Sequence, residues 1–212
     1  MSGRLIVIGN SYYSNYRGLV SIYRASDGVL LKQFSGSGSN DYLGYSVAID
    51  GDTVVAGAWE WPNEGFAKVY RTPDGGDTWT TVATLTASDG AKNDYFGRSV
   101  AVAGDTIFVG AYGDDDDGTN SGSVYVFRTT DGGATYDEVE TLKASSPKAG
   151  ANFGNALAAD GDTLVIGAYS DNSYKGAVYV FRKSGSTYAQ VARLTGSGVA
   201  SDDEFGTSVD VS

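Results

Sequence analysis

The sequence predicts an all-β fold made of four repeated units, each with four antiparallel strands. Similar sequence motifs recur along the chain at intervals of roughly 50 to 57 residues, the range in which four-stranded propeller blades repeat. Inside each copy, short runs rich in Val, Ile, Tyr, Phe and Thr alternate with Gly, Asp, Asn and Ser, and no segment has helical periodicity. The 30 glycines fit a fold with many tight turns. We therefore predict a single β-propeller domain over residues 1–212.

The best preserved copy indicates how the four strands follow one another. Its first strand begins after Phe96-Gly97, and its second strand ends at Gly110-Ala111. The third strand ends at Arg128, and the fourth covers residues 136–142. Small residues such as Ser99 in the first strand suit the crowded position nearest the propeller axis.

The fourth copy is split between the two ends of the chain. The repeats cover residues 40–92, 93–150, 151–201, and 202–212 together with 1–39. This arrangement predicts a four-bladed ring in which one blade is closed by N- and C-terminal strands, so that no inner strand stays unpaired. The alternative is an eight-bladed ring in which two chains exchange their terminal strands. We favour the monomer, with the homodimer as the alternative.

Composition excludes several classes of function. The chain has 26 acidic and 15 basic residues and a net charge of −11, which argues against nucleic acid as a partner. No apolar run approaches the roughly 20 residues of a membrane span, so we expect no membrane insertion. The chain has no His and no Cys, which removes the usual Ser-His and Cys-His nucleophile pairs and His-based metal sites. We predict no enzyme activity, no catalytic residues and no required cofactor.

The repeated motifs resemble those of a known family. Phe96-Gly97, Gly110-Ala111, Phe153-Gly154 and Gly167-Ala168 are similar to the FG-GAP repeat, the blade of integrin α-subunit propellers and of many bacterial and protist surface proteins. The resemblance implies an interaction or adhesion module at the cell surface or outside the cell, although the residues themselves do not specify a compartment. Integrin-type blades hold calcium between their first and second strands. Here that connection shrinks to turns such as Ala103-Gly104-Asp105, so we do not transfer those calcium sites.

A second resemblance lies between the third and fourth strands. Residues 72–79 and 129–136 are similar to the Asp-box of sialidase-like propellers. In those families the box is a folded turn remote from the active site, so the resemblance implies a structural role. The arginine that repeats at the end of each third strand, such as Arg71, also indicates a structural role at the blade edge.

The candidate binding surface is one rim of the propeller. In a four-stranded meander, the loops joining strands two and three open on the same face as the loops joining strand four to the next blade. Both sets combine Tyr and Trp with Asp and Asn, which suits a protein partner or a polar ring ligand. We predict protein binding, with a lectin-like glycan-binding propeller and a purely structural or assembly domain as alternatives. The predicted ligand-binding residues are Tyr12, Tyr13, Tyr16, Trp61, Tyr174, Asp171 and Asn172. The aromatics after Gly-Ala, Trp59, Tyr112 and Tyr169, are expected to pack beneath their own loops.

One rim loop contains a run of acidic residues. Such a run is typical of a solvated loop whose charges repel. Calcium binding is the alternative interpretation, because hard oxygen ligands cluster there. The predicted metal ligands are Asp114, Asp115, Asp116, Asp117 and Asn120.

Overall fold

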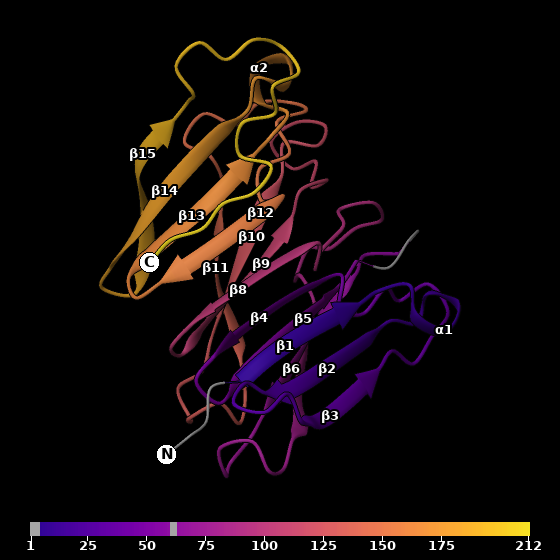
Figure 1. Ribbon diagram of the computed structural model, residues 1–212. Coiled ribbons are helices and arrows are strands. Elements are labelled where there is room, and N and C mark those ends of the chain that lie inside the picture. The colour runs from indigo at the N-terminus through magenta and orange to yellow at the C-terminus, as the bar shows by residue number, and fades with distance from the viewer. Residues whose placement is uncertain (1–4, 60–62) are drawn as a thin grey trace.

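The computed structural model describes residues 5–59 and 63–212, and its strands form four antiparallel sheets. Each sheet is a meander in chain order, and the sheets follow one another from the indigo to the yellow end of the chain (Figure 1). The predicted all-β fold and its propeller blades are confirmed.

Blade one contains β1 (Leu5–Asn10), β2 (Leu19–Arg24) and β3 (Leu30–Ser35). Blade two contains β4 (Ser46–Asp50), β5 (Thr53–Ala58), β6 (Phe66–Arg71) and β7 (Thr80–Leu85). Blade three contains β8 (Ser99–Ala103), β9 (Thr106–Ala111), β10 (Ser123–Arg128) and β11 (Asp137–Leu142). Blade four contains β12 (Ala156–Asp160), β13 (Thr163–Ala168), β14 (Ala177–Ser184) and β15 (Thr187–Leu194).

The core lies between successive blades, because each sheet packs face to face with the next. Strands β5 and β9 are buried along their whole length, as expected for strands covered on both faces. Between blades two and three, Val55 and Val69 from one sheet lie in the same cluster as Val100 and Val109 from the next. This stacking explains why the second and third strands are almost continuously apolar while the fourth strands are not.

The Phe-Gly words join each blade to the one before it. The Phe96 ring is 1% exposed and its backbone forms a parallel bridge with Gly65 of blade two. Leu43 makes the same bridge with Gly18, where blade one meets blade two. A Cβ atom at Gly97, which has a φ of +88°, would lie 2.4 Å from the Phe66 carbonyl oxygen. The glycine is therefore required by close contact between backbones as well as by its conformation.

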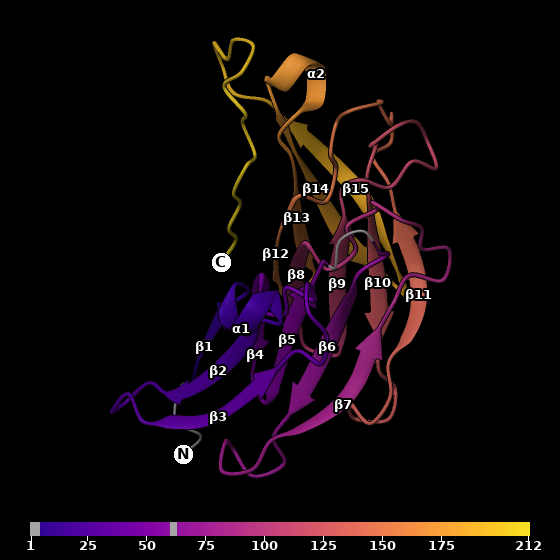
Figure 2. The same ribbon diagram turned by 90° about the vertical axis from the view of Figure 1, so that its right-hand side faces the viewer.

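The expected closure of one blade by both termini is wrong in this structure. Blade one has three strands, and β1, which ends in Gly9-Asn10, is the counterpart of the second strand in the other blades. Residues 202–212 form no strand and run as the yellow trace beside blade four (Figure 2). Phe205 does bridge to Gly176 of blade four, as Leu43 and Phe96 bridge to the blade before them, but the residues after it do not pair with β1. Ile6 and Ile8 of β1 stay 44% and 51% exposed.

Two short turns interrupt the strands, α1 (Tyr13–Tyr16) and α2 (Asp171–Tyr174). Each one joins the strands that correspond to the second and third of a blade. No helix in the described part of the chain has the length and apolar character that a membrane span requires.

Candidate binding face

The two predicted sets of loops do lie together on one face, which we call the loop face. Backbone hydrogen bonds join them at each blade boundary. The Tyr42 amide donates to the Tyr16 carbonyl at 2.8 Å, and the Glu204 amide donates to the Tyr174 carbonyl at 2.7 Å. The loops with described residues on this face are 11–18, 36–45, 63–65, 86–98, 112–122, 143–155, 169–176 and 195–206.

The turns α1 and α2 are left-handed. In α1, Ser14, Asn15 and Tyr16 have φ values of 47°, 63° and 62°. In α2, residues 172–174 have φ values of 56°, 60° and 58°. A left-handed conformation costs a non-glycine residue roughly 1–2 kcal/mol. Strained segments of this kind concentrate at ligand clamps and other functional sites, so the turns mark the loop face as a candidate for binding.

The two turns hold exposed tyrosine side chains. Tyr12, Tyr13 and Tyr16 of blade one are 67%, 46% and 42% exposed, and Tyr174 of blade four is 48% exposed. These are four of the ligand-binding residues predicted from the sequence. Trp61, which was predicted with them, lies outside the described residues.

A row of aromatic rings connects blade one to blade three across the loop face. The Tyr16 and Tyr42 ring centroids are 5.4 Å apart, and the Tyr42 ring stacks on Trp59 at 4.6 Å. Trp59 lies 5.7 Å from Tyr95, which stacks on Tyr112 at 5.0 Å. In each of these pairs the two rings come from different loops. The row of rings therefore holds neighbouring loops together and fixes the rings in place.

A pocket of about 310 Å³ opens where the inner strands begin. It is lined by side chains from blades two, three and four and by the segment that follows blade four. We call it the central pocket. Its lining residues are Tyr45, Arg98, Tyr112, Asn155, Tyr169, Glu204 and Thr207.

The guanidinium of Arg98 is the cation of the central pocket. It lies 4.0 Å from the centre of the Tyr45 ring and 5.6 Å from the centre of the Tyr112 ring. Burial raises the pKa of the Tyr112 hydroxyl, and the nearby Arg98 charge opposes that shift. Asn155 is already occupied, because its side chain donates to the Thr207 carbonyl and accepts from the Tyr169 amide, both at 3.2 Å. The charged groups of the pocket are therefore Arg98 and Glu204.

The sequence prediction missed this pocket. Tyr112 and Tyr169 were expected to pack beneath their own loops, yet both line it. A usable signal was present in the repeat. The residue directly after each Phe-Gly or Leu-Gly word changes its chemistry from copy to copy, while the words on both sides stay similar. Those residues are Tyr45, Arg98, Asn155 and Thr207.

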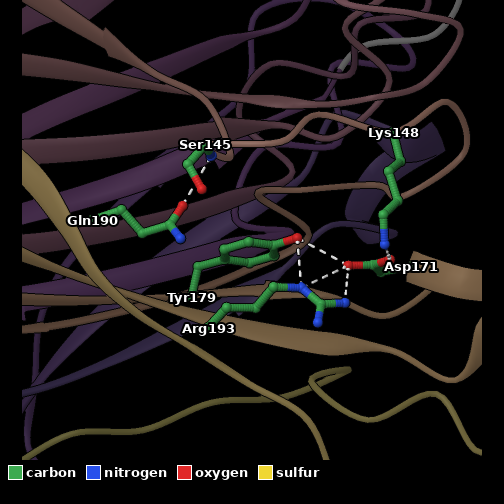
Figure 3. A network of polar contacts seen from close by, with 6 residues as sticks. All are labelled: Ser145, Lys148, Asp171, Tyr179, Gln190 and Arg193. Atoms are coloured by element: carbon green, nitrogen blue, oxygen red, sulfur yellow. Dashed lines mark hydrogen bonds and ion pairs between the residues drawn. The ribbon is translucent and has the colours of Figure 1, made fainter.

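Asp171, also predicted to bind ligand, has a fully buried side chain at the start of α2 (Figure 3). The Lys148 ammonium donates to its Oδ1 at 2.8 Å, and Arg193 Nη2 donates to its Oδ2 at 2.6 Å. The Tyr179 hydroxyl donates to the same Oδ2 at 2.9 Å. Burial acts to raise the pKa of Asp171, but the hydrogen bonds from Lys148, Arg193 and Tyr179 outweigh it and lower the pKa. Asp171 thus holds the base of α2, while the neighbouring Asn172 is exposed.

The acidic loop of blade three is held by its own hydrogen bonds. Asp114 is 3% exposed and accepts from the Tyr125 hydroxyl at 2.9 Å. Asp115 accepts from the Asn120 amide at 2.6 Å. Both Asp116 and Asp117 pair with Lys143, at 3.2 and 3.1 Å. No group of three or more acidic side chains within residues 5–59 and 63–212 gathers around a point that could hold a metal. Calcium binding by this loop stays a prediction.

The two Asp-box-like turns are also internally bonded. The Asp74 carboxylate accepts from the Thr78 hydroxyl at 2.7 Å and from the Thr78 amide at 2.9 Å. Hydrogen bonds from the Thr78 side chain and backbone, and then from Thr72, lower the pKa of Asp74 to about 2. Arg71 of blade two donates to the Gly132 carbonyl in the equivalent turn of blade three. That contact gives one of the repeated arginines the structural role expected for it.

Comparisons with known proteins agree with the repeat pattern. The FG-GAP repeat family matches residues 35–69, 79–127 and 136–181, which make up more than half of the chain. The crystal structure of Saccharomyces cerevisiae Sqt1 is similar, with a TM-score of 0.45 and 14% identity over 71% of this chain and 34% of that chain. This chain therefore spans about a third of the length of that protein. No curated protein sequence matches the chain. The matched segments cover blades two, three and most of four, and the chain belongs to the FG-GAP repeat family.

Proposed function

We propose that this chain is a non-catalytic interaction or adhesion module that binds a protein partner through its loop face. The observation that carries the proposal is the pair of left-handed turns, α1 and α2, which hold tyrosines exposed at opposite ends of the row of blades. Membership of a family of repeat propellers supports an interaction role in general terms.

The distribution of the aromatic side chains favours a large partner. Tyr12, Tyr13 and Tyr16 belong to blade one, whereas Tyr174 belongs to blade four. A stable protein interface covers about 800 Å² on each partner, which is enough to span several blades. Tyrosine is enriched among residues that contribute most to such interfaces, because it combines a large apolar ring with a polar tip.

A glycan is the competing ligand, and the size of its contact area distinguishes it from a protein partner. A single sugar ring would need only one small site such as the central pocket, whose volume of about 310 Å³ is at the lower end for ligand pockets. A glycan held there would leave Tyr13 of blade one without a role. A protein partner would engage Tyr13 and Tyr174 together.

The test is photo-crosslinking from single positions in cells. A photoreactive phenylalanine analogue replaces Tyr13 or Tyr174, and a control carries it at Asp77 in an Asp-box-like turn. We expect one and the same protein to be captured from both loop-face positions, and the capture to be lost when the other tyrosine is changed to alanine before irradiation. Capture from the Asp77 position alone, or no protein captured from either tyrosine, would contradict the proposal. A glycan array read in parallel identifies the lectin alternative if binding is inhibited by a monosaccharide.

A further inference from the structure

We infer that the central pocket receives a carboxylate group of the partner, held by Arg98. The inference rests on the proposed function, and it names the chemistry at the centre of the loop face. Within the described residues, no ion pair involves Arg98. Its guanidinium lies against the rings of Tyr45 and Tyr112 and also interacts with the Tyr112 hydroxyl.

Among the described arginines, only Arg24 and Arg193 form ion pairs. Arg98 differs from the other unpaired arginines because it lies against tyrosine rings in a pocket. Arg98 is half-buried, and its neighbours from five other segments are tyrosine, asparagine, threonine and one glutamate. Contact with the Tyr45 ring restricts the direction in which the planar guanidinium presents its N–H groups. A preorganised guanidinium presents a planar fork that matches the two oxygens of a carboxylate.

The remaining polar groups of the pocket favour a peptide over a simple anion. Asn155 and Thr207 use their side chains within the protein, since the Thr207 hydroxyl donates to the Glu204 carbonyl at 2.7 Å. That leaves the Glu204 carboxylate as an acceptor for an N–H group. An acidic residue in an extended peptide supplies both kinds of group, a side-chain carboxylate for Arg98 and main-chain amides for Glu204.

Tyr45, Tyr112 and Tyr169 supply the apolar walls around this position. Such rings exclude water from an ion pair, which strengthens it relative to an exposed pair. The net charge of −11 works in the opposite direction, because it repels an acidic partner at long range. Affinity should therefore depend on contact with Arg98 itself rather than on general attraction. Raising the salt concentration should weaken binding little, because it also screens the long-range repulsion.

The experiment uses the chain immobilised and a phage-displayed library of random twelve-residue peptides as the probe. We expect the selected peptides to share an Asp or Glu, and replacement of that residue by Asn or Gln to weaken binding about tenfold or more. Arg98→Gln should cause a similar loss. Arg182→Gln makes the same substitution at an exposed arginine outside the loop face and should leave the affinity unchanged. The ligand-side substitution keeps the test decisive even where Arg98→Gln alters folding.

The possible results separate this inference from the proposed function. Peptides that compete for the Tyr13 and Tyr174 surface but ignore both Arg98→Gln and the loss of their own carboxylate would overturn the carboxylate site alone. Failure to select any peptide, together with no protein captured from the loop face in cells, would overturn the proposed function itself. Binding of glucuronic acid but not glucose, abolished by Arg98→Gln, would show that the carboxylate comes from a glycan and would overturn the protein source.

Discussion

Blades three and four each place a buried aspartate beside a tyrosine at the same position of the repeat, but the two blades compensate the charge of the aspartate differently. In blade four, buried Asp171 accepts from Tyr179 and pairs with Lys148 and Arg193. In blade three, buried Asp114 accepts from Tyr125, and the Tyr125 hydroxyl also lies 2.8 Å from Asp89. The repeat therefore determines the tyrosine–aspartate pair, whereas residues outside the repeated words determine its charge.

The consequence is a local excess of negative charge in blade three. Burial first, and then repulsion from Asp114, Asp115 and Asp89, raises the pKa of Asp94 to about 6, although the Ala91 amide opposes the shift. One hydroxyl donates one proton, so Tyr125 cannot satisfy Asp89 and Asp114 when both are ionised. Blade four avoids this problem because two cations face its aspartate. The two blades should therefore respond in opposite ways to pH and to the removal of a cation.

Removing the arginine of blade four should have the largest effect. Arg193→Met leaves the buried Asp171 with Lys148 and Tyr179 only, and we expect a loss of about 3 kcal/mol in the free energy of unfolding, because a buried charge loses its closest partner. Urea denaturation at pH 7 measures it. Arg182→Met, which removes an exposed arginine from the same sheet, is the control and should change stability by less than about 0.5 kcal/mol. Equal losses in the two variants would show that Asp171 does not depend on its ion pair.

The pH dependence of blade three should be the next largest effect. Because the folded protein holds the Asp94 proton more tightly than the unfolded chain, protonation of Asp94 stabilises the fold below about pH 4, and this contribution is lost as the pH rises through about 6. Asp94→Asn keeps an acceptor for the Ala91 amide and removes the charge. We expect the variant to gain about 2 kcal/mol over the natural chain between pH 4 and pH 7.

The equivalent aspartate of blade two provides the control for that titration. The Asp41 carboxylate accepts from the Gly38 amide at 2.8 Å, as Asp94 accepts from the Ala91 amide. Asp41→Asn is measured over the same pH series, so that the difference between the two variants reports the repulsion specific to Asp94. Parallel curves for the Asp94 and Asp41 variants would contradict the idea of a local excess of charge in blade three.

An arginine introduced into blade three at the position equivalent to Arg193 tests the comparison further. Thr141 pairs with Tyr125 in the sheet, as Arg193 pairs with Tyr179. Thr141→Arg should therefore place a guanidinium near Asp114 and stabilise the chain by about 1 kcal/mol at pH 7. Thr84→Arg, which pairs with Lys68 in blade two, should give no gain. Thermal unfolding of both variants measures the difference.

Relief of backbone strain in α2 should have the smallest effect on stability. Ser173 has a φ of 60°, so Ser173→Gly should raise the free energy of unfolding by about 0.5 kcal/mol, the relief being partly offset by the entropy of glycine. Ser173→Ala removes the hydroxyl without relieving the backbone and should not stabilise. If Tyr174 must be held rigidly for binding, the glycine variant should also bind more weakly, and a more stable variant with unchanged binding would argue against that role.

Much of the fold could be predicted from the sequence, because the repeated words specify it directly. The Phe-Gly and Gly-Ala words fix the strand order, and their glycines are needed where backbones meet, as at Gly97. The closure of the ring could not be predicted in this way. The motif that opens a blade is the same whether the residues after it join a new sheet or not. Phe205 docks on blade four as Phe96 docks on blade two, so neither the motif nor its docking predicts whether the ring closes.

The candidate site could be predicted only in part. Tyr13 and Tyr174 could be predicted as binding residues from the sequence, because the repeat itself does not require tyrosine at those positions. The central pocket was not, since Tyr112 occupies a repeated position that normally indicates packing. Asp171 was predicted to face a ligand, but Lys148 and Arg193 come from a loop and a strand whose contact with it depends on how the blades stack.

The most direct test of the loop face is amide hydrogen exchange of the chain with and without the partner captured from Tyr13. The account predicts slower exchange in residues 11–18, 112–122 and 169–176 of the loop face, and no change in the Asp-box-like turns at residues 72–79 and 129–136. Protection confined to the Asp-box-like turns, or spread evenly over both regions, would contradict a binding site on the loop face.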